Sequence, residues 1–408
     1  MALLLQMQRC VKVKPYNHQL VIAEQAAEIL REHMIVYLAM EERTGKTLTS
    51  ILVVEALAVA KCLVITKKKA LDGWLDTIAK YKPTKQLDVT NYHQVAKLEP
   101  MDYDIVIIDE AHSYVSGYPK TSKMWADVKR MTLGKPIIYL SATPYAQGYQ
   151  LLYHQFALSY WSPWKKHKNF YQWFAMYGIP KSIYANGRQI PQYNSVREDA
   201  FDCVKHLFIT KTRKELDFEH EPEDVIHLVE LNDWTKALYN QLTKERIVRL
   251  PNDQELICDT TMKLRTSLHM LEGGTAKIDN VYLDLPNREK IDYILANWGD
   301  SPDVVIMYQY IAELAKLQAA FKQAKILQAT SYAEGVDLSS YSHLIIYSQD
   351  WSTARHSQRR ARQANMARKT PIKVHFLLVE KAISEQVYTA VAKNKVNYID
   401  SLYYGEEL

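Results

Sequence analysis

Apolar runs separated by polar clusters divide the first part of the chain into predicted strands and helices. Residues 35–39 are uninterruptedly apolar, which is typical of a buried strand, and residues 48–60 continue as a helix former. A second apolar run, residues 103–108, is followed at once by Asp109 and Glu110. Continuous apolar runs of this length are typical of strands that are buried on both faces, as in parallel sheets. The pattern therefore predicts an α/β fold.

The second half of the chain shows the same kind of pattern, interrupted by a helical stretch. Residues 225–231 and 304–308 predict strands, and much of the sequence between them has the apolar periodicity of helices. We predict two tandem α/β lobes with mainly parallel sheets, residues 1–215 and residues 216–408. A small helical insertion is expected within the second lobe, at about residues 232–285.

The segment between the first predicted strand and the first predicted helix has the composition of a phosphate-binding loop. A Gly-Lys-Thr triplet at a helix N-terminus can hold phosphate with backbone N–H groups and the helix dipole. Lys46 would bridge the β- and γ-phosphates, and the Thr47 hydroxyl would bind Mg²⁺. Met40 stands where the strict pattern has its first glycine. The nucleotide-binding residues expected in this loop are Arg43, Thr44, Gly45, Lys46 and Thr47.

Two carboxylates follow the second predicted strand. Ligands of parallel sheets bind at the carboxyl ends of the strands, which is where Asp109 and Glu110 are expected. Asp109 would hold Mg²⁺, and Glu110 would orient and activate the water that attacks the γ-phosphate. An Asp-Glu pair after a strand can also be a solvated turn, but its position after a phosphate-binding loop favours the catalytic interpretation. The expected cofactors are ATP and Mg²⁺.

Composition narrows the class of protein further. With 408 residues, 48% of them hydrophobic, the chain can form two sizeable domains. No apolar run reaches the length of about 18 residues that a membrane span needs, and the N-terminal segment lacks the basic start of a secretion signal. The four cysteines lie far apart with no Cys-x-x-Cys pair, which disfavours zinc and disulfides and favours a cytoplasmic location. A net charge of +5 suits a polyanionic partner.

The order of the motifs resembles helicase superfamily 2. Within that superfamily the chain is similar to the Swi/Snf-like DEAH-box DNA translocases, in the compact form that bacteriophages encode. The resemblance implies two RecA-like lobes with ATP in the cleft and nucleic acid bound across the top, and it implies that Gln19 reads the adenine base. It rests on three segments in this order: Gly45-Lys46-Thr47, Asp109-Glu110-Ala111-His112 and Ser141-Ala142-Thr143-Pro144.

The resemblance also implies roles for residues of the second lobe. Gly335 and Asp337 lie in a segment that looks like motif V, at the edge that faces ATP. Arg359 and Arg362 lie in a segment that matches motif VI, where an arginine stabilises the charge that the γ-phosphate gains during transfer. We expect Arg362 to fill this role. The family usually has a second arginine three residues further on, where this chain has Asn365.

Several basic and polar residues are expected to contact nucleic acid. By resemblance to motifs Ia, Ib and III, those of the first lobe are Lys67, Lys68, Lys69, Asn91, Tyr92 and Thr143. A further cluster, Lys165, Lys166 and Lys168, lies among aromatic residues in the segment 151–185. Such aromatic residues can stack on bases, each stack contributing roughly 1–3 kcal/mol. We favour a helical packing role for Trp161, Trp164, Tyr171 and Phe174, and a DNA contact for the lysine cluster.

These features predict an ATP hydrolase that moves along DNA as a helicase or translocase. Its expected partners are duplex, forked or single-stranded DNA and a replication or recombination protein, and we expect a monomer with no membrane association. Compact size and motif spelling suggest phage or mobile-element replication, recombination or repair. Two alternatives stay open. One is an RNA helicase, and the other is a nucleic-acid-binding or loading factor whose ATPase is weak or partner-dependent, as Met40 and Asn365 would allow.

Overall fold

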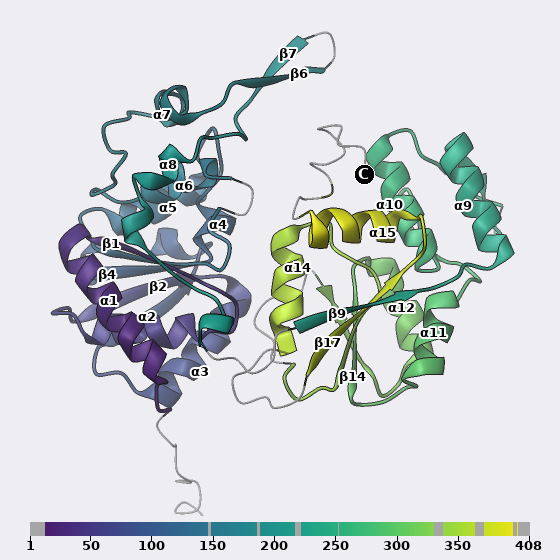
Figure 1. Cartoon of the computed structure of the whole chain (residues 1–408), viewed down its shortest axis with the longest axis horizontal. Helices are drawn as coiled ribbons and strands as arrows, with labels where there is room; N and C mark the ends of the chain where they lie inside the picture. The colour runs from purple at the N-terminus through teal and green to yellow at the C-terminus, as the bar shows by residue number, and fades with distance from the viewer. Residues whose placement is uncertain are drawn as a thin grey trace, which may run out of the picture. The chain divides into compact units, whose positions relative to one another are not determined.

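A parallel β-sheet organises each of the two units into which the chain folds, Met1–Asp217 and Phe218–Leu408 (Figure 1). The computed structural model describes residues 13–145, 148–185, 188–216, 222–251, 253–329, 338–363, 371–394 and Tyr398. Every strand pair of the two main sheets is parallel. The predicted fold, two α/β lobes of the RecA-like kind, is therefore confirmed.

The first sheet is built from the apolar runs of the first unit. Its strand order is β3-β2-β4-β5-β1-β8, so β5 lies between β1 and β4. The central strands are buried on both faces, which is why their sequences are continuously apolar and do not alternate. The strands are β1 Ile35–Met40, β2 Lys61–Thr66, β3 Gln86–Asn91, β4 Ile105–Asp109, β5 Ile137–Leu140 and β8 Phe208–Lys211.

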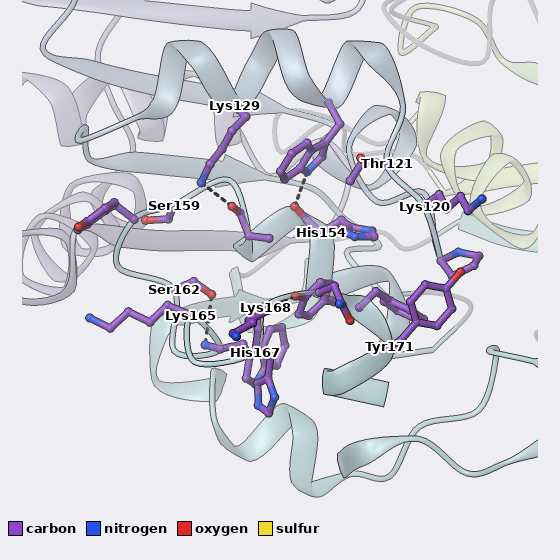
Figure 2. A pocket seen from close by; sticks show the side chains of 18 residues that line it. Lys120, Thr121, Lys129, His154, Ser159, Ser162, Lys165, His167, Lys168 and Tyr171 are labelled. Atoms are coloured by element: carbon purple, nitrogen blue, oxygen red, sulfur yellow. Dashed lines mark hydrogen bonds between the residues drawn. The ribbon is translucent and has the colours of Figure 1, made fainter. Parts of the chain in front are cut away.

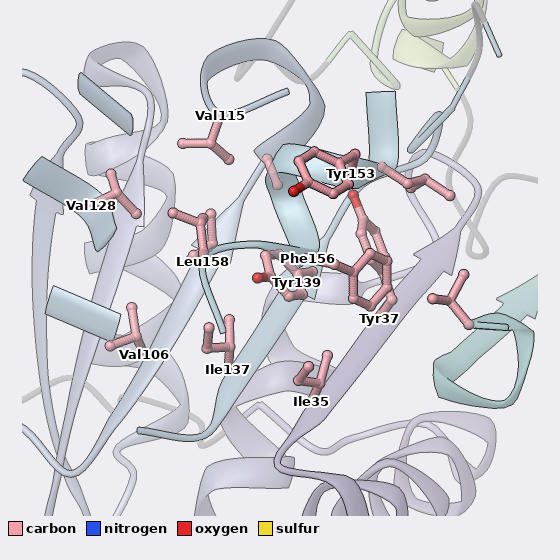
Figure 3. Close-up of a cluster of buried hydrophobic side chains, with 14 of the residues drawn as sticks. Ile35, Tyr37, Val106, Val115, Val128, Ile137, Tyr139, Tyr153, Phe156 and Leu158 are labelled. Atoms are coloured by element: carbon pink, nitrogen blue, oxygen red, sulfur yellow. The ribbon is translucent and has the colours of Figure 1, made fainter. Parts of the chain in front are cut away.

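Helices cover both faces of this sheet. In Figure 1, α1 and α2 lie on one side of the strands and α5 and α6 lie on the other. Figure 3 shows the second of these faces, where Tyr37 and Tyr139 pack with Phe156 in one buried cluster. The helices are α1 Asn17–His33, α2 Lys46–Glu55, α3 Leu71–Tyr81, α4 Ala111–Tyr114, α5 Lys123–Thr132, α6 Gln150–Phe156, α7 Phe170–Tyr177 and α8 Asp199–Asp202.

Most aromatic residues that follow β5 pack onto this same face. Trp164 and Phe174 are buried in the cluster that contains β1 and β5, so the packing role predicted for them is confirmed. Tyr171 differs, because its side chain is 45% exposed. Beyond α7 the chain forms an antiparallel hairpin that extends away from the sheet in Figure 1, β6 Lys181–Ala185 and β7 Arg188–Gln192. Short 3₁₀ turns are η1 Lys68–Ala70, η2 Val95–Lys97, η3 Pro100–Asp102, η4 Lys205–Leu207 and η5 Lys214–Leu216.

The second unit repeats the design with a five-stranded sheet in the order β15-β14-β16-β17-β9. Its strands are β9 Pro222–Leu228, β14 Val304–Tyr308, β15 Lys325–Gln328, β16 His343–Ile346 and β17 Ile372–Leu378. The flanking helices are α11 Glu289–Asn297, α12 Ile311–Ala320, α14 Thr353–Arg360, α15 Ile383–Tyr388, the 3₁₀ turn η6 Ala361–Gln363 and the π-helical turn η7 Thr389–Lys393.

The segment between β9 and β14 contains strands as well as the predicted helices. The helices are α9 Asp233–Glu245 and α10 Thr261–Glu272, which pack with α15 around Leu242 and Leu268. Two antiparallel hairpins accompany them, β10 Ile247–Arg249 with β11 Glu255–Ile257, and β12 Thr275–Ile278 with β13 Val281–Asp284. These strands have three or four residues each, too few for alternation to stand out from a helical pattern. Across the described ranges, no helix is both long enough and apolar enough to cross a bilayer.

Candidate nucleotide and nucleic-acid site

The topology of the first sheet brings the two predicted nucleotide motifs to one edge. The loop after β1 begins at Glu41, and Asp109 is the last residue of β4. Because both strands run parallel to β5, which separates them, their carboxyl ends lie at the same edge of the sheet. This is the edge at which open parallel sheets bind their ligands.

The predicted phosphate-binding loop closes tightly over Gln19. Gly45 has a φ of +85°, and a Cβ added there would collide with the Gln19 amide nitrogen. The same amide donates to the Gly45 carbonyl at 3.3 Å, while the Gln19 carbonyl oxygen accepts from the Tyr16 N–H at 2.9 Å. Helix α2 begins directly afterwards at Lys46. Glycine is therefore required at position 45 by both its backbone angle and its close neighbour.

Lys46 lies close enough to nearby carboxylates for their charges to affect its pKa. Its ammonium group donates to the Met40 and Glu41 carbonyls, each at 2.8 Å. Burial lowers the pKa of Lys46, and the negative charges of Glu42, Glu110 and Asp109 act against that shift. A lysine held at the loop in this way carries its charge toward the start of α2, where a phosphate group would bind.

Asp109 is held by residues of the neighbouring strand and helix. Its Oδ2 accepts from the Thr66 hydroxyl at 2.7 Å and from the Trp74 indole N–H at 3.0 Å. Burial, followed by the charge of Glu110, raises the pKa of Asp109, whereas these two hydrogen bonds and Lys46 lower it. Sequence reasoning missed Thr66 and Trp74 as supports of Asp109, although Thr66 ends an apolar run as Asp109 does.

Glu110 adopts a backbone conformation that is unusual for a residue with a side chain. Its φ is 53°, and its N–H donates to the Leu140 carbonyl at 2.8 Å. Backbone conformations of this kind occur often at functional sites, where the surrounding structure holds them in place. The Glu110 carboxylate contacts His112 Nδ1 at 3.3 Å, and that nitrogen is 2.7 Å from the Ser141 hydroxyl. Ser141 Oγ in turn accepts from the Thr143 N–H at 3.0 Å.

Arg213 braces the phosphate-binding loop and was not singled out from the sequence. Its backbone N–H donates to the Glu41 carboxylate at 2.8 Å, and its guanidinium donates to the Glu42 carbonyl at 3.3 Å. The guanidinium also lies 3.7 Å from the carboxylate oxygens of both glutamates. The arginine therefore offsets two negative charges in a loop that is expected to bind phosphate.

Thr47 and Asp109 fit a magnesium ion chemically. Mg²⁺ prefers hydroxyl and carboxylate oxygens, and it is usually held by one or two protein ligands together with phosphate oxygens and water. In the part of the chain that the structure describes, no group of three or more His, Cys, Asp or Glu residues is arranged to hold a metal ion. A pair of oxygen ligands beside a phosphate-binding loop agrees with that mode of binding.

The residues predicted to contact nucleic acid in the first unit divide by exposure. Lys68 and Lys69 are exposed at η1, whereas Lys67 is buried and lies over the Tyr114 ring at 5.9 Å. Asn91 is half-buried at the end of β3. Tyr92 is in the core, and its hydroxyl donates to the Asp109 carbonyl at 2.6 Å. The structure thus gives Tyr92 a supporting role at Asp109 in place of the predicted contact with nucleic acid.

The remaining predicted contacts are Thr143 and the cluster Lys165, Lys166 and Lys168. Thr143 is half-buried, and the three lysines are exposed on the segment between α6 and α7. The geometry is therefore compatible with a phosphate contact from each lysine.

In the second unit the arginines after β16 have different surroundings. Arg359 is buried and donates to Gln309 Oε1 at 3.0 Å and to Asp350 at 3.2 Å. Burial lowers the pKa of Arg359 to about 10, against the charge of Asp350. Arg362 is also buried, and its carbonyl accepts from the Leu338 N–H at 3.2 Å. Gly335 and Asp337 lie outside the described residues.

Comparisons with known proteins give a distant structural match. No protein-family model and no curated protein matches the chain. Among solved structures, the SWI2/SNF2 ATPase core domain of Sulfolobus solfataricus matches 97% of this chain and 92% of its own, with 13% sequence identity and a TM-score of 0.42. At that identity and TM-score the match supports no conclusion about activity, so any assignment depends on the residues described above.

Proposed function

We propose that the protein is an ATP-dependent motor that moves along DNA as a translocase or helicase. The observation that carries the proposal is the clustering of Lys46, Asp109 and Glu110 at the carboxyl edge of one parallel sheet. A lysine at a phosphate-binding helix N-terminus, with a carboxylate pair close to it, supplies the groups that transfer of a phosphoryl group to water requires.

In the proposed reaction each residue of the cluster has one task. Lys46 exchanges its loop carbonyls for phosphate oxygens of ATP, and the N-terminus of α2 holds the β-phosphate with its N–H groups. Glu110 orients the attacking water and accepts its proton. Thr47 and Asp109 would hold Mg²⁺, and the bound ion would supply charge that neutralises the phosphates. Thr66 and Trp74 keep the Asp109 carboxylate in place.

We propose that the contacts from Glu110 to Thr143 couple hydrolysis to nucleic acid. His112 and Ser141 link the catalytic carboxylate to the Thr143 backbone through contacts of 3.3, 2.7 and 3.0 Å. A strand that contacts Thr143 would bias the position of Ser141, and through His112 the position of Glu110. Such a chain of short polar contacts gives nucleic acid a physical route to change the rate of hydrolysis.

The expectation that the track is a nucleic acid rests on the basic residues of the first unit, and the resemblance of motifs Ia, Ib and II to the Swi/Snf-like branch favours DNA. Lys68 and Lys69 are exposed at η1, and Lys165 and Lys168 are exposed between α6 and α7. Lysine contacts to phosphate position a strand without reading its bases, so we expect weak sequence preference and strong salt dependence. The proposal extends to phage or mobile-element replication, recombination or repair, supported by the motif spelling.

Steady-state ATP hydrolysis tests the proposal directly. The purified full chain is assayed with no nucleic acid, single-stranded DNA, duplex DNA, forked DNA and RNA. Glu110→Gln provides the inactive reference, and Glu28→Gln, which alters an exposed carboxylate of α1, is the matched control. We expect DNA to stimulate turnover in the wild type and in Glu28→Gln, and no turnover in Glu110→Gln.

The nucleic acid that stimulates turnover distinguishes the possible activities. Stimulation by duplex DNA supports a translocase, and preference for a single strand supports a helicase. Stimulation by RNA alone, with a requirement for 2′-hydroxyl groups, replaces DNA by RNA as the track. Turnover no higher than that of Glu110→Gln on every substrate contradicts the proposal and leaves a binding or loading factor.

A further inference from the structure

A large cavity in the first unit lies apart from the nucleotide-binding cluster. Its volume is about 950 Å³, and its walls come from α5, α6, the start of α7 and the segment that joins α6 to α7 (Figure 2). The described residues that line it include four lysines, six aromatic residues and two histidines, but no aspartate or glutamate. The cavity therefore carries positive charge that no lining carboxylate compensates.

One of the four lysines is hydrogen-bonded to the backbone of the cavity wall, and the other three are exposed. The Lys129 ammonium donates to the Ala157 carbonyl at 2.7 Å and to the Leu158 carbonyl at 3.0 Å, and burial lowers its pKa. Lys120, Lys165 and Lys168 are exposed at the cavity. Their charges are available to an anionic ligand, and they cost little to desolvate compared with buried groups.

The three exposed lysines are spread along the cavity. In Figure 2, Lys165 lies toward one end, Lys120 toward the other, and Lys168 lies between them. A site for one phosphate group gathers its cations around a point, as bidentate or clustered contacts do. Cations placed along a groove instead match a ligand with several phosphates in series.

Two exposed tyrosines complete the lining. Tyr160 is 65% exposed and Tyr171 is 45% exposed, although their neighbours Trp164 and Phe170 are buried in the core. Most aromatic residues of this segment thus stabilise the fold, and these two are left facing solvent beside the lysines. Aromatic rings next to cations in a groove are the usual platform for unpaired bases.

We propose that this cavity binds a single strand of nucleic acid, with Lys120, Lys165 and Lys168 at its phosphates and Tyr160 and Tyr171 against its bases. The inference rests on the proposed function and extends it, because it places a strand-binding groove outside the segments that resemble motifs Ia, Ib and III. Lys120 in particular lies in a segment to which the sequence assigned no role.

Binding of a fluorescently labelled oligothymidine to the full chain, followed by anisotropy over a range of salt concentrations, tests the groove. The test variant combines Lys120→Ala, Lys165→Ala and Lys168→Ala. The matched control combines Lys80→Ala, Lys205→Ala and Lys244→Ala, which removes the same charge from exposed lysines that do not line the cavity. Thermal melting of both variants confirms that they are folded.

The expected result is specific to the cavity. Loss of three phosphate contacts should weaken binding at least about tenfold and make the slope of log affinity against log salt shallower by about 2. The control should keep the wild-type slope to within about 1. Tyr160→Ala and Tyr171→Ala should each weaken binding roughly tenfold with an unchanged slope, because stacking releases no counterions.

Two further measurements test whether the ligand is a strand and whether it lies in the cavity. Affinity should rise with oligonucleotide length, and equal competition by inorganic tripolyphosphate would show a small-anion site and overturn the proposal. A strand that contains 4-thiothymidine should cross-link on irradiation to the peptides that carry Tyr160 or Tyr171, and cross-links only elsewhere would also overturn it.

Binding by the triple variant and ATP hydrolysis by the wild type test the groove and the motor separately. If the triple variant binds with wild-type affinity and slope, the proposed strand-binding groove is ruled out. If DNA still stimulates ATP hydrolysis by the wild type, the proposed motor function stands. A wild-type protein that binds no nucleic acid removes both.

Discussion

Each unit of this protein places a lysine beside carboxylates, and the two clusters differ in what surrounds them. In the first unit, burial lowers the pKa of Lys46 and raises the pKa of Asp109, and the charge of Glu110 acts on both. In the second unit, Lys290 and Glu272 lie 3.7 Å apart with no exposed side-chain surface. Burial lowers the pKa of that lysine and raises the pKa of that glutamate. The electrostatic signature is the same in both places.

The second cluster is enclosed by protein groups, whereas the first lies at the end of strands. Lys290 also donates to the Tyr347 carbonyl at 3.1 Å, and Glu272 accepts from the Ser384 N–H at 3.2 Å. The first cluster lies at the carboxyl edge of its sheet, beside a glycine loop and the left-handed backbone of Glu110. Perturbed pKa values alone therefore do not mark a reactive site. Groups with perturbed pKa values indicate a reactive site when they also lie at a sheet edge that can admit a ligand.

The largest effect that distinguishes the clusters should come from Lys46→Ala. Without the ammonium group the charge on the phosphates is not stabilised, so we expect ATP turnover to fall on the order of a thousandfold or more. The free energy of unfolding should change little, because Lys46 is only half-buried and water can reach the Met40 and Glu41 carbonyls that it leaves. Steady-state turnover and urea unfolding measure the two effects. Turnover within tenfold of the wild type would sink the assignment of this cluster as catalytic.

Arg362→Ala should lower turnover nearly as far, although the residue belongs to the second unit. The expected cause is loss of the guanidinium that stabilises charge on the γ-phosphate. Arg359→Ala is the informative companion, because it leaves the buried Asp350 without one of its partners and should reduce stability. If Arg362→Ala keeps its turnover and Arg359→Ala loses it while staying folded, the two roles are exchanged.

Lys290→Met should act on stability and leave the reaction alone. It retains the apolar volume but leaves Glu272 buried without its counter-charge, which costs about 3–5 kcal/mol of unfolding free energy. Adding Glu272→Gln should recover part of that loss. Lys244→Met on the exposed face of α9 is the control and should stay within about 0.5 kcal/mol of the wild type. An unchanged denaturation midpoint in Lys290→Met would mean that the buried pair contributes nothing.

The residues of the proposed catalytic cluster could be named from the sequence, and the residues that support them could not. Lys46 and Glu110 belong to short motifs whose chemistry depends on near neighbours in the chain, which is what a sequence displays. Thr66 and Trp74 reach Asp109 from 43 and 35 residues away. Arg213 reaches Glu41 from 172 residues away. Only the fold brings such pairs together, so spacing and composition give no sign of them.

In the fold, too, some features follow from the local sequence and others do not. The long apolar strands and the α/β architecture follow from periodicity. Three predicted strands lie within about two residues of β1, β4 and β14, whereas the predicted strand 225–231 lies three residues after the observed β9, as is usual for boundaries. The hairpins β10-β11 and β12-β13 did not follow from it. Their strands have three or four residues, and cross-strand packing in the second unit decides their conformation more than local preference does.

The smallest effect we expect is a pH dependence of stability in the second unit, which would show that buried titratable groups there serve structure. His375 on β17 lies 2.9 Å from His227 on β9, and burial, followed by the charges of His227, His343 and Lys373, lowers the pKa of His375 to about 4 from 6.5. Between those values the unfolded chain binds more protons than the folded chain. Stability is therefore fully present above pH 6.5 and is lost as the pH falls toward 4, by on the order of 2 kcal/mol.

Urea unfolding of the full chain at several pH values checks this slope, with His375→Gln as the variant. Glutamine keeps hydrogen-bonding atoms near His227 but does not titrate, so the slope between pH 6.5 and 4 should become shallower. Some slope should persist, because burial also lowers the pKa of His356, to about 3. An identical slope in wild type and variant would show that His375 titrates alike in the folded and unfolded chains. His375 would then make no contribution to the acid sensitivity of the second unit.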